Sequence, residues 1–142
     1  MTYCTLDQLT ERYGEKMLRQ LTDRATPPAG AIDAAVVDRA LADTDASIDG
    51  YLAGRYQLPL GATPALLADL AQTIAIYKLH GQTVAQKVAD DYAQALKMLG
   101  LIAAGVVRLG VAGIEPPASG ASGVRTNDRE RDITPDNLRG FI

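Results

Sequence analysis

The sequence contains one histidine and one cysteine, the residue types most often used as a general base and a nucleophile. His80 stands beside Gly81, where a helical pattern ends, and a general base there would need a positioned partner. Its position is more typical of a side chain that interacts with the free carbonyl groups at a helix C-terminus. Cys4 lies near an N-terminus that we expect to be flexible, away from any activating base, so we interpret it as a small hydrophobe.

Carboxylates are more numerous, but their spacing does not match a known set of metal ligands. Asp43, Asp45 and Asp49 fall within a helical pattern, whereas a calcium loop needs twelve residues with a central glycine. Asp90 and Asp91 point in different directions around a helix, so a solvated face is the simpler interpretation. A single histidine and a single cysteine also lack the spacing of zinc ligands. We therefore predict no metal and no cofactor.

No phosphate-binding loop is recognisable either. The glycines of LAGRYQLPLG (residues 52–61) lack the spacing of a P-loop or a dinucleotide-binding turn. The remaining catalytic alternative is an acidic site that pairs His80 with Asp91 or Glu15, and retained function after a neutral substitution of His80 would exclude it. We predict that the protein is not an enzyme.

Composition indicates a single globular domain. The chain has 142 residues, of which 47% are apolar and 22% charged, and it has only one Phe and no Trp. A core of Ala, Leu, Ile and Val favours close-packed helices. The net charge of −3 offers no basic excess for nucleic-acid phosphates, so specific DNA binding is not expected. The polar N-terminus and the lack of a long apolar stretch predict no signal peptide and no membrane contact. The single cysteine, Cys4, cannot form an internal disulfide, which fits a reducing cytoplasm.

Two short helices are predicted near the N-terminus. Thr5 and Gln8 have the spacing of a capping box ahead of a helix over Leu6–Tyr13. Gly14 can end that helix, and apolar residues at helical spacing predict a second one over Glu15–Thr22. A loop with two prolines follows it.

Three longer helices are predicted to follow. An apolar stripe behind the N-cap Asp33 predicts a helix from Ala34 to about Arg55, with Asp38, Asp45 and Asp49 on a solvated face. Thr63 as N-cap and Pro64 at the first helical position begin the next helix, which His80-Gly81 ends. That helix is apolar around much of its circumference, so we expect it at the centre of the fold. The last helix is predicted over Thr83–Ala104, with Gly105 at its C-cap.

The rest of the chain differs in composition. Gly113–Gly123 is rich in Pro, Gly, Ser and Ala and is typical of a flexible linker. Val124–Ile142 is dense in charge and ends in an apolar tip, so it cannot bury enough surface to fold alone. We therefore predict an all-α fold: a compact bundle of about four to five helices over residues 1–110, and a flexible linker and C-terminal docking arm over 111–142.

Two segments are candidate protein interfaces. The junction Ile48–Leu60 carries Tyr51, Arg55 and Tyr56, residue types that favour interfaces. The simpler explanation is a helix end, with tyrosines covering the core and Arg55 satisfying the carbonyl groups of the last turn. The arm is either plainly disordered or orders on a partner, with arginines making charge-assisted contacts and apolar residues as anchors. Its candidate residues are Arg125, Arg129, Arg131, Leu138, Arg139, Phe141 and Ile142.

The sequence resembles a family of small proteins of Mu-like phages and prophages. The resemblance is carried, in order, by LTDR (residues 21–24), IDGYLAGRYQLPL (48–60), TPALLADLAQTIAIYKLHG (63–81), DYAQALKMLGLIAAGVVRLG (91–110) and the ending LRGF (138–141). The family is of unknown function and is similar to the head–tail connector, or head-completion, proteins of long-tailed phages.

This resemblance implies a connector-like helical adaptor that acts in virion assembly. Such a subunit would sit beneath the portal in a ring of its own copies, expected to be dodecameric in the virion. It would join the packaged head to a tail-completion or tail-terminator protein. DNA would pass through the channel without specific binding. The expected locations are the host cytoplasm during assembly and then the head–tail joint of the virion.

The alternative is a small helical protein-binding module or regulator of phage or prophage origin, which would use the same arm on another partner. Neighbouring portal, capsid and tail genes would favour the connector.

Overall fold

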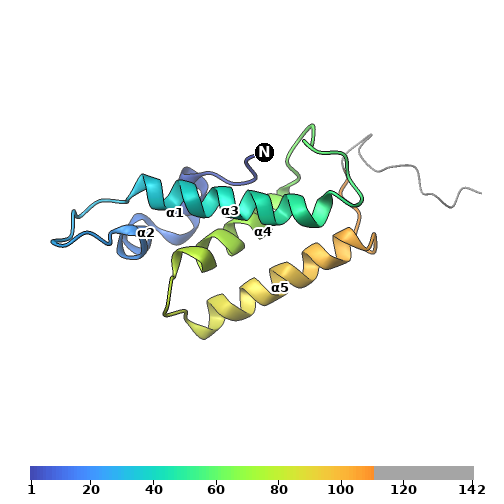
Figure 1. Ribbon diagram of the computed structural model, residues 1–142. Helices are drawn as coiled ribbons and strands as arrows, with labels where there is room; N and C mark the ends of the chain where they lie inside the picture. The colour runs from blue at the N-terminus through green and yellow to red at the C-terminus, as the bar shows by residue number, and fades with distance from the viewer. Residues whose placement is uncertain (111–142) are drawn as a thin grey trace, which may run out of the picture.

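The computed structural model describes residues 1–110, which form five α-helices and connecting turns. The helices are α1 (Leu6–Tyr13), α2 (Glu15–Thr22), α3 (Ala34–Leu52), α4 (Ala65–Leu79) and α5 (Gln86–Ala103). Helices α3, α4 and α5 pack against one another, α1 packs against α4, and α2 packs against α3. Figure 1 shows α3 and α5 running in the same direction, with α4 antiparallel to them. The all-α helical fold is therefore confirmed.

Helix α4 lies at the centre of this bundle, as its apolar circumference predicts. Eight of its residues are buried, and they cover all sides of the helix: Leu67, Leu70, Ala71, Thr73, Ile74, Ala75, Ile76 and Leu79. Helices α3 and α5 bury only one stripe each, because each has a face toward solvent. Helix α4 therefore contributes more buried apolar residues to the core than any other helix.

Several local signals in the sequence are confirmed. The Thr5 hydroxyl accepts a hydrogen bond from the Gln8 N–H, and the Gln8 side chain accepts one from the Thr5 N–H, which completes the capping box. The Asp33 side chain caps α3. Gly81 and Gly105 have φ of +60° and +79°, so α4 and α5 both end at a glycine in the left-handed region.

Three predicted helix boundaries are wrong. Helix α3 ends at Leu52 rather than Arg55, because Leu52 O accepts backbone hydrogen bonds from both Arg55 and Tyr56 in a closing turn. Helix α4 has Pro64, not Thr63, in the extended conformation of an N-cap, and no side chain caps it. Helix α5 begins at Gln86, because the preceding residue also has an extended backbone.

The N-terminal segment packs on α3, where the sequence predicts a flexible N-terminus and solvated aspartates. Tyr3 is 2% exposed and Cys4 is 1% exposed. The Tyr3 N–H donates to Asp45 Oδ1 at 3.0 Å, and the Tyr3 hydroxyl donates to Asp49 Oδ1. Burial raises the pKa of Asp45. The prediction of a solvated face is therefore wrong for Asp45 and Asp49, since a segment far away in the sequence covers them.

Candidate functional site

The predicted junction at the end of α3 is a structural anchor for the turn that follows α5. Tyr56 is only 4% exposed, and its hydroxyl accepts a hydrogen bond from the Leu109 N–H at 3.3 Å. The guanidinium of Arg55 lies against Gly105, in the space that a Cβ atom would occupy. Tyr56 therefore packs in the core of the subunit, which agrees with the alternative explanation of a helix end with tyrosines covering the core, and its role as an interface residue stays a prediction.

Tyr51, by contrast, remains available to a partner. It is 37% exposed on the last turn of α3, whereas the next residue, Leu52, is fully buried. Leu101 and Val106, which the sequence did not single out, are 37% and 73% exposed. The Val106 N–H donates to Leu101 O at 2.9 Å, so Val106, in the turn after α5, lies next to the last turn of the helix, which contains Leu101. Figure 1 shows that α3 and α5 finish at the same end of the bundle, so the three exposed side chains share that end.

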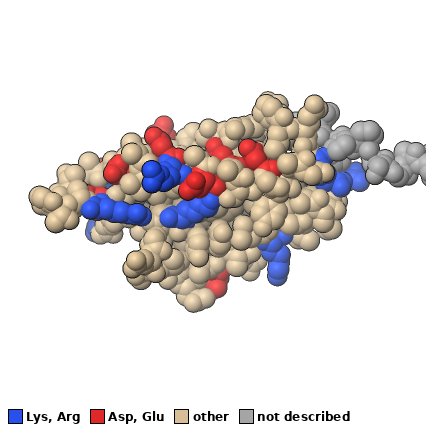
Figure 2. All heavy atoms as spheres, in the orientation of Figure 1, with Lys and Arg blue, Asp and Glu red and all other residues tan. Residues whose placement is uncertain are grey.

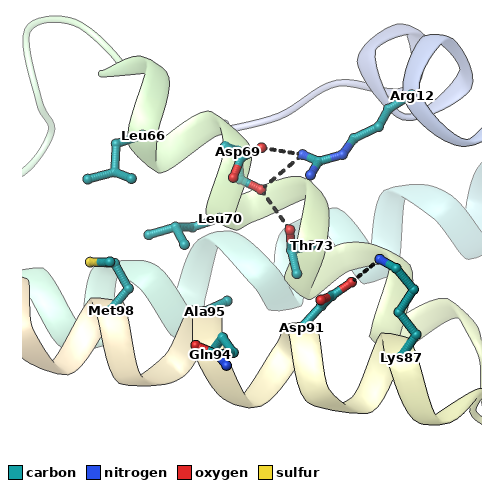
Figure 3. Close-up of a pocket in the computed structure, with 10 residues that line it drawn as sticks. All are labelled: Arg12, Leu66, Asp69, Leu70, Thr73, Lys87, Asp91, Gln94, Ala95 and Met98. Carbon is teal, nitrogen blue, oxygen red and sulfur yellow. Dashed lines mark hydrogen bonds and ion pairs between the residues drawn. The ribbon is translucent and has the colours of Figure 1, made fainter.

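A second candidate surface is a groove that lies over α4, between α1 and α5. Its wider part has a volume of about 400 Å³ and is lined by residues of α1, α4 and α5. Figure 3 shows its walls: Leu66 and Leu70 of α4 face Ala95 and Met98 of α5 across the opening. Spacings of three and four residues on α5 bring its lining residues to one side of that helix. We call the whole hollow the α4–α5 groove.

Ion pairs border the α4–α5 groove. Arg12 of α1 forms a salt bridge with Asp69 of α4, and Lys87 pairs with Asp91 one turn along α5 at 2.9 Å. Both pairs are visible in Figure 3, on either side of Thr73. The hydrogen bond to Asp91 raises the pKa of Lys87. The carboxylates are 58% and 50% exposed, so solvent screens both pairs and they contribute little to stability.

A narrower, more apolar part continues the α4–α5 groove toward α2. It has a volume of about 220 Å³ and shares Thr73, Lys87 and Asp91 with the wider part. Four different helices supply its apolar lining, which consists of Tyr13, Met17, Ile76 and Val88. Burial raises the pKa of the Tyr13 phenol, partly offset by nearby Arg12 and a hydrogen bond with Thr73. A half-buried apolar recess of this kind is open to an apolar side chain from outside.

The two residues that could do chemistry have structural surroundings. His80 Nδ1 lies 2.7 Å from Ile76 O, which agrees with the predicted interaction at the end of α4. No hydrogen bond or ion pair joins His80 to Asp91 or Glu15 within residues 1–110. Cys4 is buried, and burial raises the pKa of its thiol to about 11. In the same residues, no three His, Cys, Asp or Glu side chains gather as a metal site.

Charged side chains are unevenly distributed over the described surface. In the view of Figure 2, acidic side chains gather along the upper edge, over α3, and basic ones lie beside and below them and toward the right of the view. Helix α3 contributes the exposed Asp38, Arg39 and Asp43 to this surface, while Asp45 and Asp49 are partly covered by the N-terminal segment. None of the helices in residues 1–110 combines the length and the apolar character needed to cross a membrane.

The predicted arm residues lie outside the described residues. They are Arg125, Arg129, Arg131, Leu138, Arg139, Phe141 and Ile142. Of the predicted interface set, the structure therefore places only Tyr51, Arg55 and Tyr56, and it brings Arg55 and Tyr56 to the turn after α5. The α4–α5 groove had no sequence signal, because its residues come from separate helices.

Residues 3–127 match the family described as Bacteriophage Mu, Gp36. The chain is 31% identical over 140 residues to the Mu-like prophage FluMu protein gp36 of Haemophilus influenzae, covering 99% of this chain and 98% of that protein. It is 36% identical over 99 residues to Gene product J of Escherichia phage Mu, covering 70% of each chain. The chain therefore belongs to the Bacteriophage Mu Gp36 family of Mu-like phage proteins.

Proposed function

We propose that this protein is a structural subunit of a head–tail connector ring, which lies beneath the portal and joins the packaged head to the tail. The observation that carries the proposal is the exposure of Tyr51, Leu101 and Val106 at one end of the bundle in a Mu-like phage protein. Exposed apolar side chains that share one end of a small domain are typical of a protein interface. The resemblance of the sequence to head-completion proteins supports the same role.

The bundle is suited to act as a rigid body in such a ring. Helices α3, α4 and α5 pack on one another along their lengths, and the N-terminal segment is held to α3 by two hydrogen bonds from Tyr3. A rigid subunit can present the same surface to each neighbour in a closed ring. The role we propose is therefore structural and not catalytic.

The proposed partners are copies of the chain itself, the portal protein and a tail-completion or tail-terminator protein. A ring of twelve copies would match the portal, and each contact would join two different faces. DNA would pass through the channel without specific binding, because the chain has 17 acidic and 14 basic residues. The protein would act in the host cytoplasm during assembly and remain at the head–tail joint of the virion.

Electron microscopy of the purified protein, alone and mixed with its portal, tests this proposal. We expect rings, or a collar on the portal. Absence of both rings and collars, together with normal head–tail joining in phage that lack the protein, would contradict the connector role. That result would favour the alternative, a small helical protein-binding module or regulator.

Point variants test the exposed end of the bundle. Leu101→Asp and Val106→Asp each place a charge in the proposed interface, so we expect folded protein that no longer forms collars. Ala93→Asp is the matched control, because Ala93 is an exposed residue elsewhere on α5.

Deletion of 124–142 should leave the helices folded and abolish head–tail joining. Normal joining by the truncated protein would show that the arm does not dock.

A further inference from the structure

We propose that the α4–α5 groove is the docking site for the apolar segment Leu138–Ile142 of a second copy of this chain. The inference rests on the proposed ring and specifies which surfaces of adjacent subunits meet. Three observations carry it: the size and lining of the groove, the composition of the segment, and the positions of both along the chain.

The narrow part of the groove fits an apolar side chain better than a small-molecule ligand. Its volume of about 220 Å³ is below the range of roughly 300–1,000 Å³ that is usual for ligand pockets. Met17 can adapt to the shape of an incoming group, since its side chain is unbranched and flexible. Ile76 is buried at the floor of this part, and the half-buried Val88 lines it from α5.

The segment Leu138–Ile142 has matching chemistry. Leu138, Phe141 and Ile142 are spaced so that one helical turn would bring them to the same side, as in helices that dock in grooves. Arg139 is the only charged residue among these five. The carboxylates of Asp69 and Asp91 border the groove, where Arg12 and Lys87 already pair with them, and both remain exposed enough for the Arg139 guanidinium to join or replace these pairs.

The positions of groove and segment favour contact between copies. The narrow part of the groove lies at the start of α5, and the chain continues to the segment from Gly110, beyond the end of α5. Helix α5 has 18 residues and is therefore about 27 Å long. The last described residue, Gly110, and the narrow part of the groove are thus at opposite ends of α5. Such a contact is head-to-tail and is satisfied for every subunit only when the ring closes.

The linker is long enough for this contact. The 28 residues from Gly110 to Leu138 would span roughly 90 Å if fully extended, at ~3.3 Å per residue. A flexible chain of this length has an end-to-end distance of about 30 Å. An adjacent subunit therefore lies within easy reach. Ring neighbours would also hold the segment at a high effective concentration near the groove.

Tryptophan fluorescence provides a direct test, because the chain contains no tryptophan. The donor protein carries Phe141→Trp to report on the segment and Val88→Asp to block its own groove. The acceptor protein carries Phe141→Ala and keeps its groove intact. If the inference is correct, adding acceptor moves the donor emission to shorter wavelength and lowers acrylamide quenching severalfold, in a saturable manner.

Acceptor variants show where the segment binds. Val88→Asp or Met17→Asp in the acceptor should abolish the fluorescence change, whereas Ala93→Asp, an exposed change on α5, should preserve it. Circular dichroism confirms that each acceptor is folded, and the two groove variants act from different helices. An unchanged response in both folded groove variants would overturn the proposed site.

The remaining outcomes are also decisive. No spectral change with the intact acceptor at the highest soluble concentration overturns the inference. An emission shift in Phe141→Trp alone that is independent of concentration, with no response to mixing, shows docking within one chain and also overturns it. Collars on the portal without a spectral change would reject this site and leave the connector role standing. A spectral change without rings or collars would support this docking site and count against the connector role.

Discussion

The hydroxyl of Tyr56 accepts a hydrogen bond from the backbone N–H of Leu109 at 3.3 Å, which joins residues 53 positions apart. Both residues are buried, at 4% and 5% exposure. The contact ties the turn after α5 to the end of α3. It therefore sets the direction in which the chain leaves the bundle toward residues 111–142.

Tyr56→Phe should lower the free energy of unfolding by about 1 kcal/mol, because the Leu109 N–H loses its acceptor inside the protein. Urea denaturation followed by circular dichroism measures this change. Tyr51→Phe is the control, since Tyr51 is exposed and should change stability by less than about 0.5 kcal/mol. Equal losses in the two variants would contradict the anchoring role of Tyr56.

Gly105→Ala should lower the free energy of unfolding by about 2 kcal/mol, because φ is +79° and the new Cβ would meet the Arg55 guanidinium. Gly100→Ala is the matched control, because Gly100 lies within α5 and has open space around its Cα. That change should be neutral or stabilising by ~0.5–1 kcal/mol. Thermal and urea unfolding distinguish the two variants.

The double variant Arg55→Ala with Gly105→Ala separates the two causes of this loss. Removal of the guanidinium should restore the part of the stability that is lost through the overlap of the new Cβ with Arg55. The part lost through backbone strain should remain lost. If the double variant were less stable than the sum of the single changes, the overlap would not be the cause.

Thr5→Ala should destabilise the protein by about 1 kcal/mol, because it removes half of the capping box of α1. Thr63→Ala should cost less than about 0.5 kcal/mol, since Thr63 does not cap α4 in the structure. The sequence pattern alone predicts similar losses at both positions. Guanidinium unfolding of the two variants therefore decides between the sequence-based assignment and the structure.

Stability should fall in alkaline solution through Cys4 and Tyr3. Burial raises the pKa of the Cys4 thiol from 9.0 to about 11, and burial with the Asp49 hydrogen bond raises the pKa of the Tyr3 phenol. A folded-state pKa above the unfolded value means that the folded state binds more protons. The Cys4 contribution is therefore complete below pH 9.0 and is lost as the pH rises toward about 11.

Urea unfolding from neutral to alkaline pH measures the slope of the free energy of unfolding against pH. Tyr3→Phe should reduce the slope, because it removes one of the two titrating groups. The folded protein should also react slowly with a thiol reagent at neutral pH, since the thiolate is the reactive form and Cys4 is buried. Rapid labelling of the native protein would show that the N-terminal segment is not held on α3.

Local features of the fold could be predicted because their causes lie within one turn of helix. The capping box at Thr5, the N-cap at Asp33 and the glycine ends of α4 and α5 depend on neighbouring residues alone. The central place of α4 also followed from its apolar circumference. The failures at Thr63 and at the start of α5 are boundary errors, where several nearby residues could serve as the cap.

The sequence by itself determined the class of the protein: five helices, a central α4, one histidine at a helix end and membership of a Mu-like phage family. Tertiary structure alone decided which polar and aromatic residues are covered. Asp45 and Asp49 accept hydrogen bonds from Tyr3, and Tyr56 is buried by Leu109. The packing of the helices also formed the α4–α5 groove. These contacts join residues more than 40 positions apart, and side-chain periodicity reports only on neighbours along one helix.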